Sequence, residues 1–331
     1  MNELRFDGRT AIVTGGGSGI GRAHCLLLAS RGANVVVNDM GWAGYGDGRT
    51  DGSSRAENVA SEIRAAGGIA VSHQGNITRD EDAASLAQLA QDEFGGIDIL
   101  VNNAGISERL RTPVQELPND EIGEQLEVHL LAPLRVTRAV WPTMERAGYG
   151  RILTTGSAGS FGGFHPEKGG RPTGAYPAAK GALFTVTRQL ANAGRPYGIN
   201  TNMLLPWGAT PLSAETLAGS AFSRWVVANM PPEKAVAGIL WLLHDSCDLT
   251  GEFVSSAGGR VSRVTLAQSV GYFNPSLSPE DVRDNWAAIR GDVDDRQMLR
   301  EMIELTGQPR EEQALYELFG SPDDLAQASP A

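Results

Sequence analysis

The stretch Thr10–Asp39 constrains the fold of this chain more than any other. It begins with a β-branched apolar run, Thr10–Thr14, that stops at a glycine cluster, as a buried strand does. Apolar residues at helical spacing follow over Ile20–Ala29, and a second strand, Val35–Val37, leads to Asp39. A strand, a glycine turn, a helix, a strand and an acid in this order indicate a dinucleotide-binding site.

The residue types of this stretch fit the chemistry of such a ligand. Because Gly15, Gly19 and Gly21 lack side chains, a pyrophosphate can approach the backbone N–H groups at the positive end of the helix dipole. Asp39 can accept hydrogen bonds from both ribose hydroxyls and would repel a 2′-phosphate, and Ser18 adds no cation, so we expect NAD rather than NADP. A glycine cluster alone would also fit a flexible turn. A Walker phosphate loop is excluded, because no Lys-Ser/Thr pair follows the last glycine.

Length and composition limit the class of protein. A chain of 331 residues, 41% of them hydrophobic, can form one large α/β domain with an extension or two small domains. The net charge of −11 opposes nucleic acid or an anionic membrane as the main partner. No signal peptide, bilayer-spanning run or peroxisomal address is recognisable, so we expect a cytoplasmic protein that acts on a small molecule. Cys25 and Cys247 are expected to be reduced core residues.

Strands and helices continue to alternate after Asp39. The pattern predicts a helix over 55–66, a strand over 69–73, a helix over 80–94 and a strand over 97–101. This alternation predicts an α/β fold with a doubly wound parallel sheet, helices on both faces and a ligand crevice at the carboxyl ends of the strands. The glycine-rich loop 41–54 could fold over the adenosine or remain a solvated surface loop.

Three polar residues suggest the reaction. The predicted strand 151–155 runs into Ser157, and Tyr176 and Lys180 are four residues apart, which places them on one face of a helix. An adjacent ammonium lowers the pKa of a phenol, so that Tyr176 can act as a base, and Ser157 can stabilise charge on the reacting oxygen. A Tyr-x-x-x-Lys pair also occurs by chance on exposed helices. The chemistry assigned to these residues calls for no metal ion.

These motifs together resemble the short-chain dehydrogenase/reductase family, in which TGxxxGxG, NNAG and YxxxK are signatures. The resemblance assigns cofactor contacts to further residues, with Trp207 standing where the family usually has glycine. The implied cofactor-binding residues are Gly15, Ser18, Gly19 and Ile20 at the pyrophosphate, Asp39 at the ribose, Asn76 and Ile77 at the adenine, Asn103, Ala104 and Gly105 beneath the cofactor, Tyr176 and Lys180 at the nicotinamide ribose, and Thr210 at the nicotinamide amide.

His129 departs from the family pattern. It lies in a predicted long helix, 119–146, whose regularity is interrupted by Pro133 and Pro142. At this position most members of the family carry an Asn that orders a water near the lysine. A lone helical histidine can be structural, or it can take part in proton relay. A backbone carbonyl freed by a helix distortion could hold the water instead.

A narrower resemblance concerns the substrate. Residues 232–259 and 276–289, with VHLLAPLRVTRAVWP around His129, look like the (3R)-hydroxyacyl-CoA dehydrogenase part of peroxisomal multifunctional enzymes and their bacterial single-domain relatives. This implies a 3-hydroxyacyl-CoA substrate. A steroid or other bulky alcohol is the alternative, and a non-catalytic NAD-binding scaffold is the alternative from another class. The loop 160–174, with Lys168 and Arg171, could shape the substrate mouth or be solvated.

The chain is expected to comprise a Rossmann-fold domain, 1–260, and a helical extension, 261–331. Within the first unit we expect a flap over 212–230, a helix over 232–244 and a last strand over 252–256. In the extension, Ser278 and Pro279 begin a helix that carries Val282, Trp286 and Ile289 on one face. That face must be buried or form an exposed apolar patch. The resemblance implies a subunit interface of a homodimer or homotetramer, near the substrate pocket.

Overall fold

A computed structural model describes residues 3–41, 54–107, 114–161, 174–210, 221–266 and 271–290. Most of the glycine-rich loop 41–54, most of the loop 160–174 with Lys168 and Arg171, and the first part of the predicted flap lie outside the described residues. The same holds for the extension beyond residue 290.

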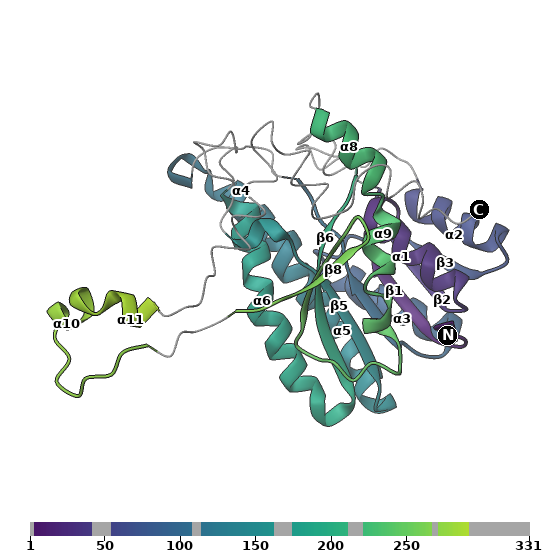
Figure 1. The fold of residues 1–331 in the computed structure, drawn as a ribbon. Coiled ribbons are helices and arrows are strands. Elements are labelled where there is room, and N and C mark those ends of the chain that lie inside the picture. Colours follow the sequence, from purple (N-terminus) through teal and green to yellow (C-terminus); the bar gives the residue numbers. More distant parts are fainter. Residues whose placement is uncertain are drawn as a thin grey trace.

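The described residues form an eight-stranded sheet with the order β3-β2-β1-β4-β5-β6-β7-β8 (Figure 1). Its neighbours pair in parallel from β3 to β7, and β8 is antiparallel to β7. The strands are β1 (Thr10–Thr14), β2 (Asn34–Asn38), β3 (Ile69–His73), β4 (Ile99–Asn102), β5 (Gly150–Thr155), β6 (Ile199–Trp207), β7 (Phe253–Ala257) and β8 (Arg260–Val264). The predicted doubly wound α/β fold is confirmed.

Helices cover both faces of the sheet, because successive side chains of each strand point to opposite sides. In β1, Ala11 and Val13 join one apolar cluster, with α1 (Gly19–Ser30), α2 (Arg55–Ala65) and α9 (Pro232–Ala237), whereas Ile12 joins another, with α3 (Asp80–Phe94) and α5 (Ala132–Ala147). The remaining described α-helices are α4 (Asn119–Leu126), α6 (Ala175–Gly194), α8 (Ala221–Asn229), α10 (Pro279–Asp284) and α11 (Trp286–Arg290). None of the helices within these ranges is both long and apolar enough to cross a bilayer.

The predicted helix 119–146 is divided into three parts. A π-helical turn, Glu127–Leu131, separates α4 from α5. Pro133 lies in the first turn of α5, where its missing N–H costs little, and Pro142 lies inside α5 without ending it. The break therefore lies just before the first proline, around His129.

Two sequence predictions near the end of the sheet are wrong. The helix predicted over 232–244 ends at Ala237, and a 3₁₀ turn, Leu240–Leu243, replaces its second half. The strand predicted over 252–256 is not the last one, because Gly258 and Gly259, with φ of 55° and 92°, close a hairpin to β8. β8 therefore spans the division predicted between residues 260 and 261.

The start of the extension forms as the sequence predicts. Ser278 Oγ accepts from Asp281 N at 3.1 Å, and Asp281 Oδ2 accepts from Ser278 N at 2.8 Å, which completes a capping box. The helix then breaks at Asn285, and α10 and α11 lie well away from the sheet in Figure 1. Phe273 is 88% exposed and Trp286 58% exposed, so within this single chain these two large apolar side chains of the extension remain uncovered.

Helix α1 buries a titratable side chain in the protein interior. His24 is fully buried, and neither of its ring nitrogens has a hydrogen-bond partner among the described residues. Burial lowers the pKa of His24 to about 3, because the imidazolium would lose its hydration without gaining a partner. The unfolded chain, in which histidine has a pKa of about 6.5, therefore binds one more proton than the native state at mildly acidic pH.

We predict that His24 destabilises the protein as the pH falls below the pKa of the unfolded histidine. At about pH 5 the loss in unfolding free energy relative to neutral pH should be about 2 kcal/mol from this residue. Denaturant titrations across this pH range should show a flatter pH dependence for His24→Leu than for the wild type. Cys25→Ala, a core change at the next residue of the helix, is the control and should keep the wild-type slope. Equal slopes for His24→Leu and wild type would contradict the prediction.

Candidate active site

The glycine turn after β1 forms a cradle that only glycine permits. Gly15 and Gly19 have φ of 62° and 51°, in the left-handed region. A β-carbon on Gly21 would lie 2.0 Å from the carbonyl oxygen of Gly15. Ser18 is the extended residue before α1, and Ile20 is buried in its first turn. These glycines let the turn fold tightly against the start of α1, and a helix N-terminus that follows such a turn fits the pyrophosphate of a dinucleotide.

The turn after β4 is fastened to this cradle. Thr14 Oγ1 accepts hydrogen bonds from the backbone N–H groups of Asn103 and Ala104, at 3.0 and 3.1 Å. Asn103 Nδ2 in turn donates to the carbonyl oxygens of Thr14 and Gly15, at 3.1 and 3.3 Å. A β-carbon on Gly15 would lie 2.7 Å from Ala104 Cα. The two glycine-containing signatures of the sequence are therefore in direct contact.

Asp39 lies beside the same turn. Its Oδ2 accepts from Gly17 N at 3.0 Å and its Oδ1 from Gly41 N at 2.8 Å, which fixes the carboxylate at the end of β2. A β-carbon on Gly17 would lie 2.6 Å from the β-carbon of Arg55, the first residue of α2. The sequence analysis missed this arginine, because only the fold brings the start of α2 to the glycine turn. The side chain of Arg55 therefore begins beside the turn that bonds Asp39.

The other predicted cofactor contacts lie at the same edge of the sheet. Asn76 follows β3, and its Oδ1 accepts from the backbone N–H and the hydroxyl of Thr78, at 3.1 and 2.9 Å, while Ile77 is buried. Thr210 follows β6, next to Ala209, whose N–H donates to Met230 O at 2.7 Å. The roles of Asn76 and Ile77 at the adenine and of Thr210 at the nicotinamide stay predictions.

β5 and α6 bring the three predicted catalytic residues to one place. Lys180 is buried, and its Nζ donates to Thr155 O at the end of β5, at 2.7 Å. Ser157 follows two residues later and accepts from Gly159 N at 3.1 Å, in a turn that packs against α6. Lys180 Nζ lies 5.9 Å from the centre of the Tyr176 ring. Burial lowers the pKa of Lys180 to about 7, because the ammonium has lost most of its hydration.

His129 contacts this group from the π-helical turn. Its ring packs edge-on to that of Tyr176, with the centroids 4.9 Å apart and the planes at 88°. Its Nε2 lies 3.0 Å from Ile106 O and 3.4 Å from Ile106 N, and with the proton on Nε2 the ring donates to the carbonyl oxygen, the shorter of the two contacts. Burial, and then the charge of Lys180, hold the pKa of His129 well below its ordinary value, so the imidazole is neutral at pH 7. The histidine that the sequence left unassigned therefore lies against Tyr176.

Two buried polar residues of α4 were also missed. Glu121 and Gln125 are fully buried and precede His129 at intervals of four residues. Their spacing was visible in the sequence as a polar stripe at helical period. The sequence could not show that the stripe faces inward, because a charged stripe on a helix is usually solvated.

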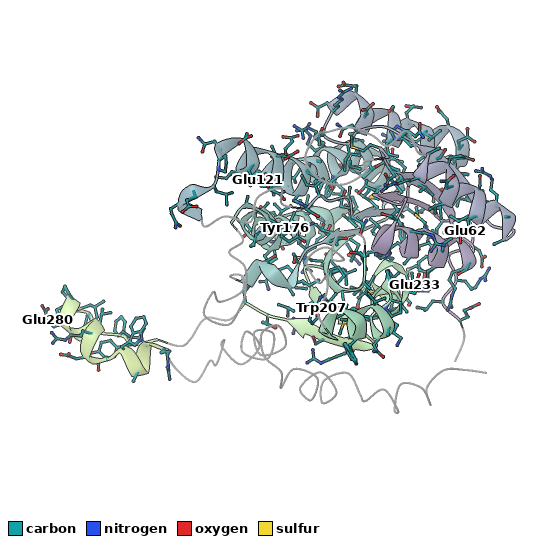
Figure 2. All side chains as sticks on the ribbon, turned by 90° about the horizontal axis from the view of Figure 1, so that it is seen from above. Glu62, Glu121, Tyr176, Trp207, Glu233 and Glu280 are labelled. Carbon is teal, nitrogen blue, oxygen red and sulfur yellow. The ribbon has the colours of Figure 1, made fainter. Side chains whose placement is uncertain are left out.

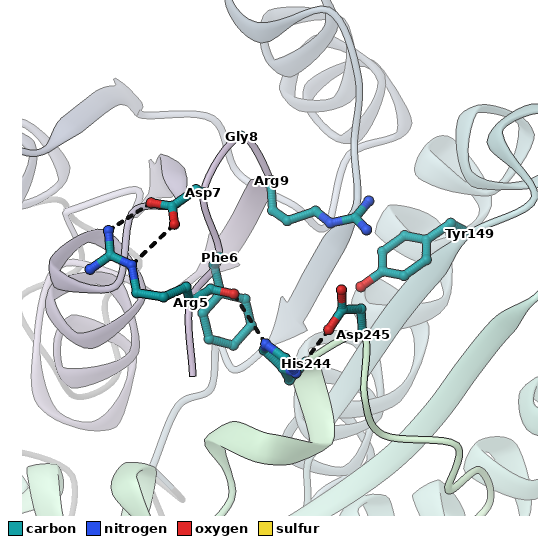
Figure 3. Close-up of a pocket in the computed structure, with 8 residues that line it drawn as sticks. All are labelled: Arg5, Phe6, Asp7, Gly8, Arg9, Tyr149, His244 and Asp245. Atoms are coloured by element: carbon teal, nitrogen blue, oxygen red, sulfur yellow. Dashed lines mark hydrogen bonds and ion pairs between the residues drawn. The ribbon is translucent and has the colours of Figure 1, made fainter. Parts of the chain in front are cut away.

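A cavity of about 300 Å³ lies elsewhere, where the N-terminal segment meets the turn before β5 (Figure 3). The amino ends of the strands form this region, opposite the edge that carries the glycine turn and Tyr176. Its arginines are already paired, Arg5 Nη2 with Asp7 Oδ1 at 2.6 Å and Arg9 Nη1 with Asp98 Oδ1 at 2.7 Å. The Arg9 guanidinium also covers the Tyr149 ring at 3.9 Å. These contacts anchor the N-terminal segment, and we assign no ligand to the cavity.

The sheet order and the glycine turn define a Rossmann-type fold, in which Lys180 is held at the carboxyl end of β5 and Tyr176 lies one helical turn from it. The model of the short chain dehydrogenase family matches residues 9–217. The chain belongs to this family, whose members are oxidoreductases that bind a nicotinamide cofactor. The resemblance predicted from the sequence is confirmed.

Known proteins similar to this chain support the same placement. It is 37% identical over 294 residues to the peroxisomal multifunctional enzyme type 2 of Mus musculus, covering 87% of this chain but only 37% of that longer protein. A short chain dehydrogenase from Mycobacterium avium has a TM-score of 0.69 and 32% identity, covering 86% of this chain and 95% of that one. A 7α-hydroxysteroid dehydrogenase complexed with NADH and 7-oxo glycochenodeoxycholic acid has a TM-score of 0.65 and 26% identity, covering 78% and 98%.

We predict that Asp39 sets the preference between the two nicotinamide dinucleotides. Asp39→Ala should weaken NADH binding by roughly 10-fold or more, because charge-assisted hydrogen bonds are lost, and should weaken NADPH binding less or not at all. Fluorescence titrations with both cofactors give the ratio of dissociation constants. Asp92→Ala, at an exposed acid of α3, is the control. An unchanged ratio in Asp39→Ala would mean that this carboxylate does not face the ribose.

Proposed function

We propose that this protein is an NAD-dependent dehydrogenase that oxidises a secondary alcohol, with a 3-hydroxyacyl-CoA as the leading substrate. The observation that carries the proposal is the buried Lys180, whose Nζ is held by Thr155 O one helical turn from Tyr176. Burying a lysine costs folding free energy, so a lysine that is buried in the native protein is expected to serve a function. Activating a neighbouring phenol is such a function, and it fits an oxidoreductase.

The proton of the alcohol goes to Tyr176. The ammonium form of Lys180 favours the phenolate of Tyr176 through its positive charge, and with a pKa of about 7 this form is populated at neutral pH. Ser157 Oγ donates a hydrogen bond to the substrate oxygen and orients it toward Tyr176. As the O–H bond breaks, the C–H bonding pair of the carbinol leaves as hydride and a carbonyl forms.

The cofactor site is built from the residues of the glycine cradle. Gly15, Ser18, Gly19 and Ile20 would hold the pyrophosphate, and Asp39 the adenosine ribose. When bound, the nicotinamide supplies the hydride acceptor. The preference for NAD rests on Asp39, whose two oxygens are fixed by backbone N–H groups, and it prevails over the nearby Arg55 in this proposal.

Two observations bear on the substrate. The similarity to a multifunctional enzyme over 87% of this chain supports a 3-hydroxyacyl-CoA, as the sequence resemblance implies. The likeness to a hydroxysteroid dehydrogenase favours a steroid as the second candidate. A panel of both stereoisomers of a 3-hydroxyacyl-CoA, hydroxysteroids and short alcohols, with NAD and NADP, read by absorbance of the reduced cofactor, separates them. Tight NADH binding without turnover of any alcohol would instead favour a non-catalytic scaffold.

The extension enters the proposal as an interface. Phe273, Leu277 and Trp286 are large apolar side chains that remain exposed in the single chain, which favours burial against a second copy. We therefore include a homodimer or homotetramer, with the extension near the substrate pocket, in the proposal. Location in the cytoplasm stays a prediction, because the mouse relative is peroxisomal by name.

We predict that Tyr176→Phe retains cofactor binding but loses roughly 10²–10⁴ in turnover, because the general base is removed while the ring and its packing remain. Steady-state rates with the best substrate and NADH fluorescence titration measure the two effects. Phe184→Leu, a packing change on the same helix away from the proposed base, is the control for disturbance of α6. Normal turnover by Tyr176→Phe would refute the mechanism.

A truncation tests the extension. The cut belongs after Leu266, because Val264 of β8 packs in a core cluster with Phe253 and must be kept. The truncated chain should bind NADH like the full chain, lose its oligomeric state in analytical ultracentrifugation, and show a raised KM for its substrate. A truncated protein that stays oligomeric with unchanged kinetics would make the extension a surface appendage.

A further inference from the structure

Three polar side chains of α4 and the π-helical turn are buried on one face. Glu121, Gln125 and His129 follow one another at intervals of four residues, and each is fully buried. Because α4 packs against α6, this face lies toward the helix that carries Tyr176; Figure 2 labels Glu121 and Tyr176 on these neighbouring elements. Burying polar groups costs free energy unless they are hydrogen-bonded, so their partners indicate what the face does.

Two of these side chains bond successive carbonyl oxygens of one loop. Gln125 Nε2 donates to Ser107 O at 3.0 Å, and His129 Nε2 donates to Ile106 O at 3.0 Å. Gln125 Nε2 also lies 3.4 Å from Glu121 Oε1, which orients the amide with its NH₂ group toward the loop. The loop Gly105–Ser107 is the continuation of the turn whose first residues are held by Thr14. It is therefore fixed at one end by β1 and at the other by α4.

The histidine ring is seated directly on this loop. A β-carbon on Gly105 would lie 2.6 Å from His129 Cε1, so a side chain there would displace the ring. The ring also packs edge-on to Tyr176. A shift of the loop would consequently reach Tyr176 through the imidazole. The i→i+5 hydrogen bonds of the π-helical turn widen the helix, so each residue turns through a smaller angle about the helix axis. His129 therefore lies closer to the face that carries Gln125 than it would in a regular α-helix.

We propose that Gln125 and His129 are positioning residues that clamp the loop Gly105–Ser107 against Tyr176, Gln125 fixing the loop beside the substrate and His129 fixing the ring of Tyr176. The inference rests on the proposed function, because it assigns both residues to the dehydrogenase site. We assign both residues a positioning role, since a glutamine amide does not pass protons and the shorter contact of His129 Nε2 is to the carbonyl oxygen of Ile106.

The geometry also explains why both residues are needed. His129 Nε2 lies 3.0 Å from Ile106 O and 3.4 Å from Ile106 N, and one nitrogen can serve only one of them at a time. A side-chain amide at position 129 offers a donor and an acceptor, and could bond both backbone groups of Ile106. With histidine at position 129, the second hydrogen bond that holds the loop is the one from Gln125 to Ser107 O. Gln125 should therefore matter less when residue 129 is asparagine.

The first test separates the two roles kinetically. Gln125→Met keeps the shape and removes the donor, and should raise the substrate KM by roughly 3- to 10-fold with little change in kcat or in NADH affinity. His129→Leu should instead lower kcat, and His129→Asn should recover more activity than His129→Leu. Gln91→Met, which removes an amide–carbonyl bond of 3.4 Å within α3, away from the loop Gly105–Ser107, is the control for the substitution itself. If Gln125→Met folds poorly, Gln125→Asn, too short to reach Ser107, takes its place.

A double-mutant cycle gives the sharper test. The effect of Gln125→Met on KM should be smaller in the His129→Asn background, because the asparagine amide supplies a second hydrogen bond to the loop. Equal effects in both backgrounds, or a substrate KM unchanged in Gln125→Met and Gln125→Asn, would overturn the clamp.

Hydrogen exchange at residues 104–107 reports the loop independently of turnover. Faster exchange in Gln125→Met but not in Gln91→Met supports the clamp, and unchanged exchange contradicts it. This readout holds even if no alcohol is turned over. That result would refute the proposed dehydrogenase activity and leave the clamp to be judged by exchange alone.

Discussion

The hydroxyl of Thr14 holds together the two turns on which the site depends. It accepts hydrogen bonds from the backbone N–H groups of both Asn103 and Ala104, so the ends of β1 and β4 are joined at the point where the chain turns. The glycine cradle begins on one side of this junction, and the loop that contacts His129 begins on the other. Since neighbouring parallel strands end at the same edge of the sheet, the side chains of Thr14 and Asn103 can tie both turns to each other. The glycine turn and the loop that contacts His129 thus share one junction.

The buried Lys180 is the central charged group of the proposed catalytic site. Lys180 is enclosed between β5 and α6, and Thr155 O receives one of its protons. Burial of the imidazole itself, and then the charge of Lys180, keep His129 neutral. The neutral imidazole packs edge-on to Tyr176 and lies within hydrogen-bond distance of Ile106 O. The proposed base Tyr176 therefore has an uncharged ring on one side and the buried Lys180 on the other.

The extension differs physically from the rest of the chain. Its first part, β8, belongs to the sheet, because the hairpin at Gly258 and Gly259 turns it back onto β7 and Val264 enters the core. Beyond it, α10 has a complete capping box and yet exposes its apolar neighbours, so local signals form the helix while no described part of the chain covers it. Helices of this length are not stable in isolation, which is consistent with the proposal that a second subunit completes their packing.

Features that depend on short-range interactions could be read from the sequence. The strand Thr10–Thr14, the glycine turn, the helix start at Ser278 and the pairing of Tyr176 with Lys180 each involve a stretch of at most seven residues, and the structure contains each of them. The helix predicted over 232–244 is wrong because the apolar period continues past Ala237 while the helix does not. It ends where Gly238 packs against β7 and β8, since a β-carbon there would lie 2.4 Å from Ser256 Oγ, and this contact between distant segments has no local signal. The roles assigned to individual cofactor contacts go beyond what spacing alone can establish.

The sequence by itself determined the alternation of strands and helices from β1 to β6, the glycine turn and the residues that could form a dehydrogenase site, but not β8. Only the tertiary structure decided which polar residues face inward. Gln125 and Glu121 look like a solvated stripe in the sequence, and they become buried because α4 packs on α6 and the carbonyl oxygens of the loop after β4 lie within reach. Arg55 reaches the glycine turn only because β1 and β2 are neighbours in the sheet. A hydrogen bond between residues distant in the chain depends on the packing of whole elements, and no local pattern encodes that distance.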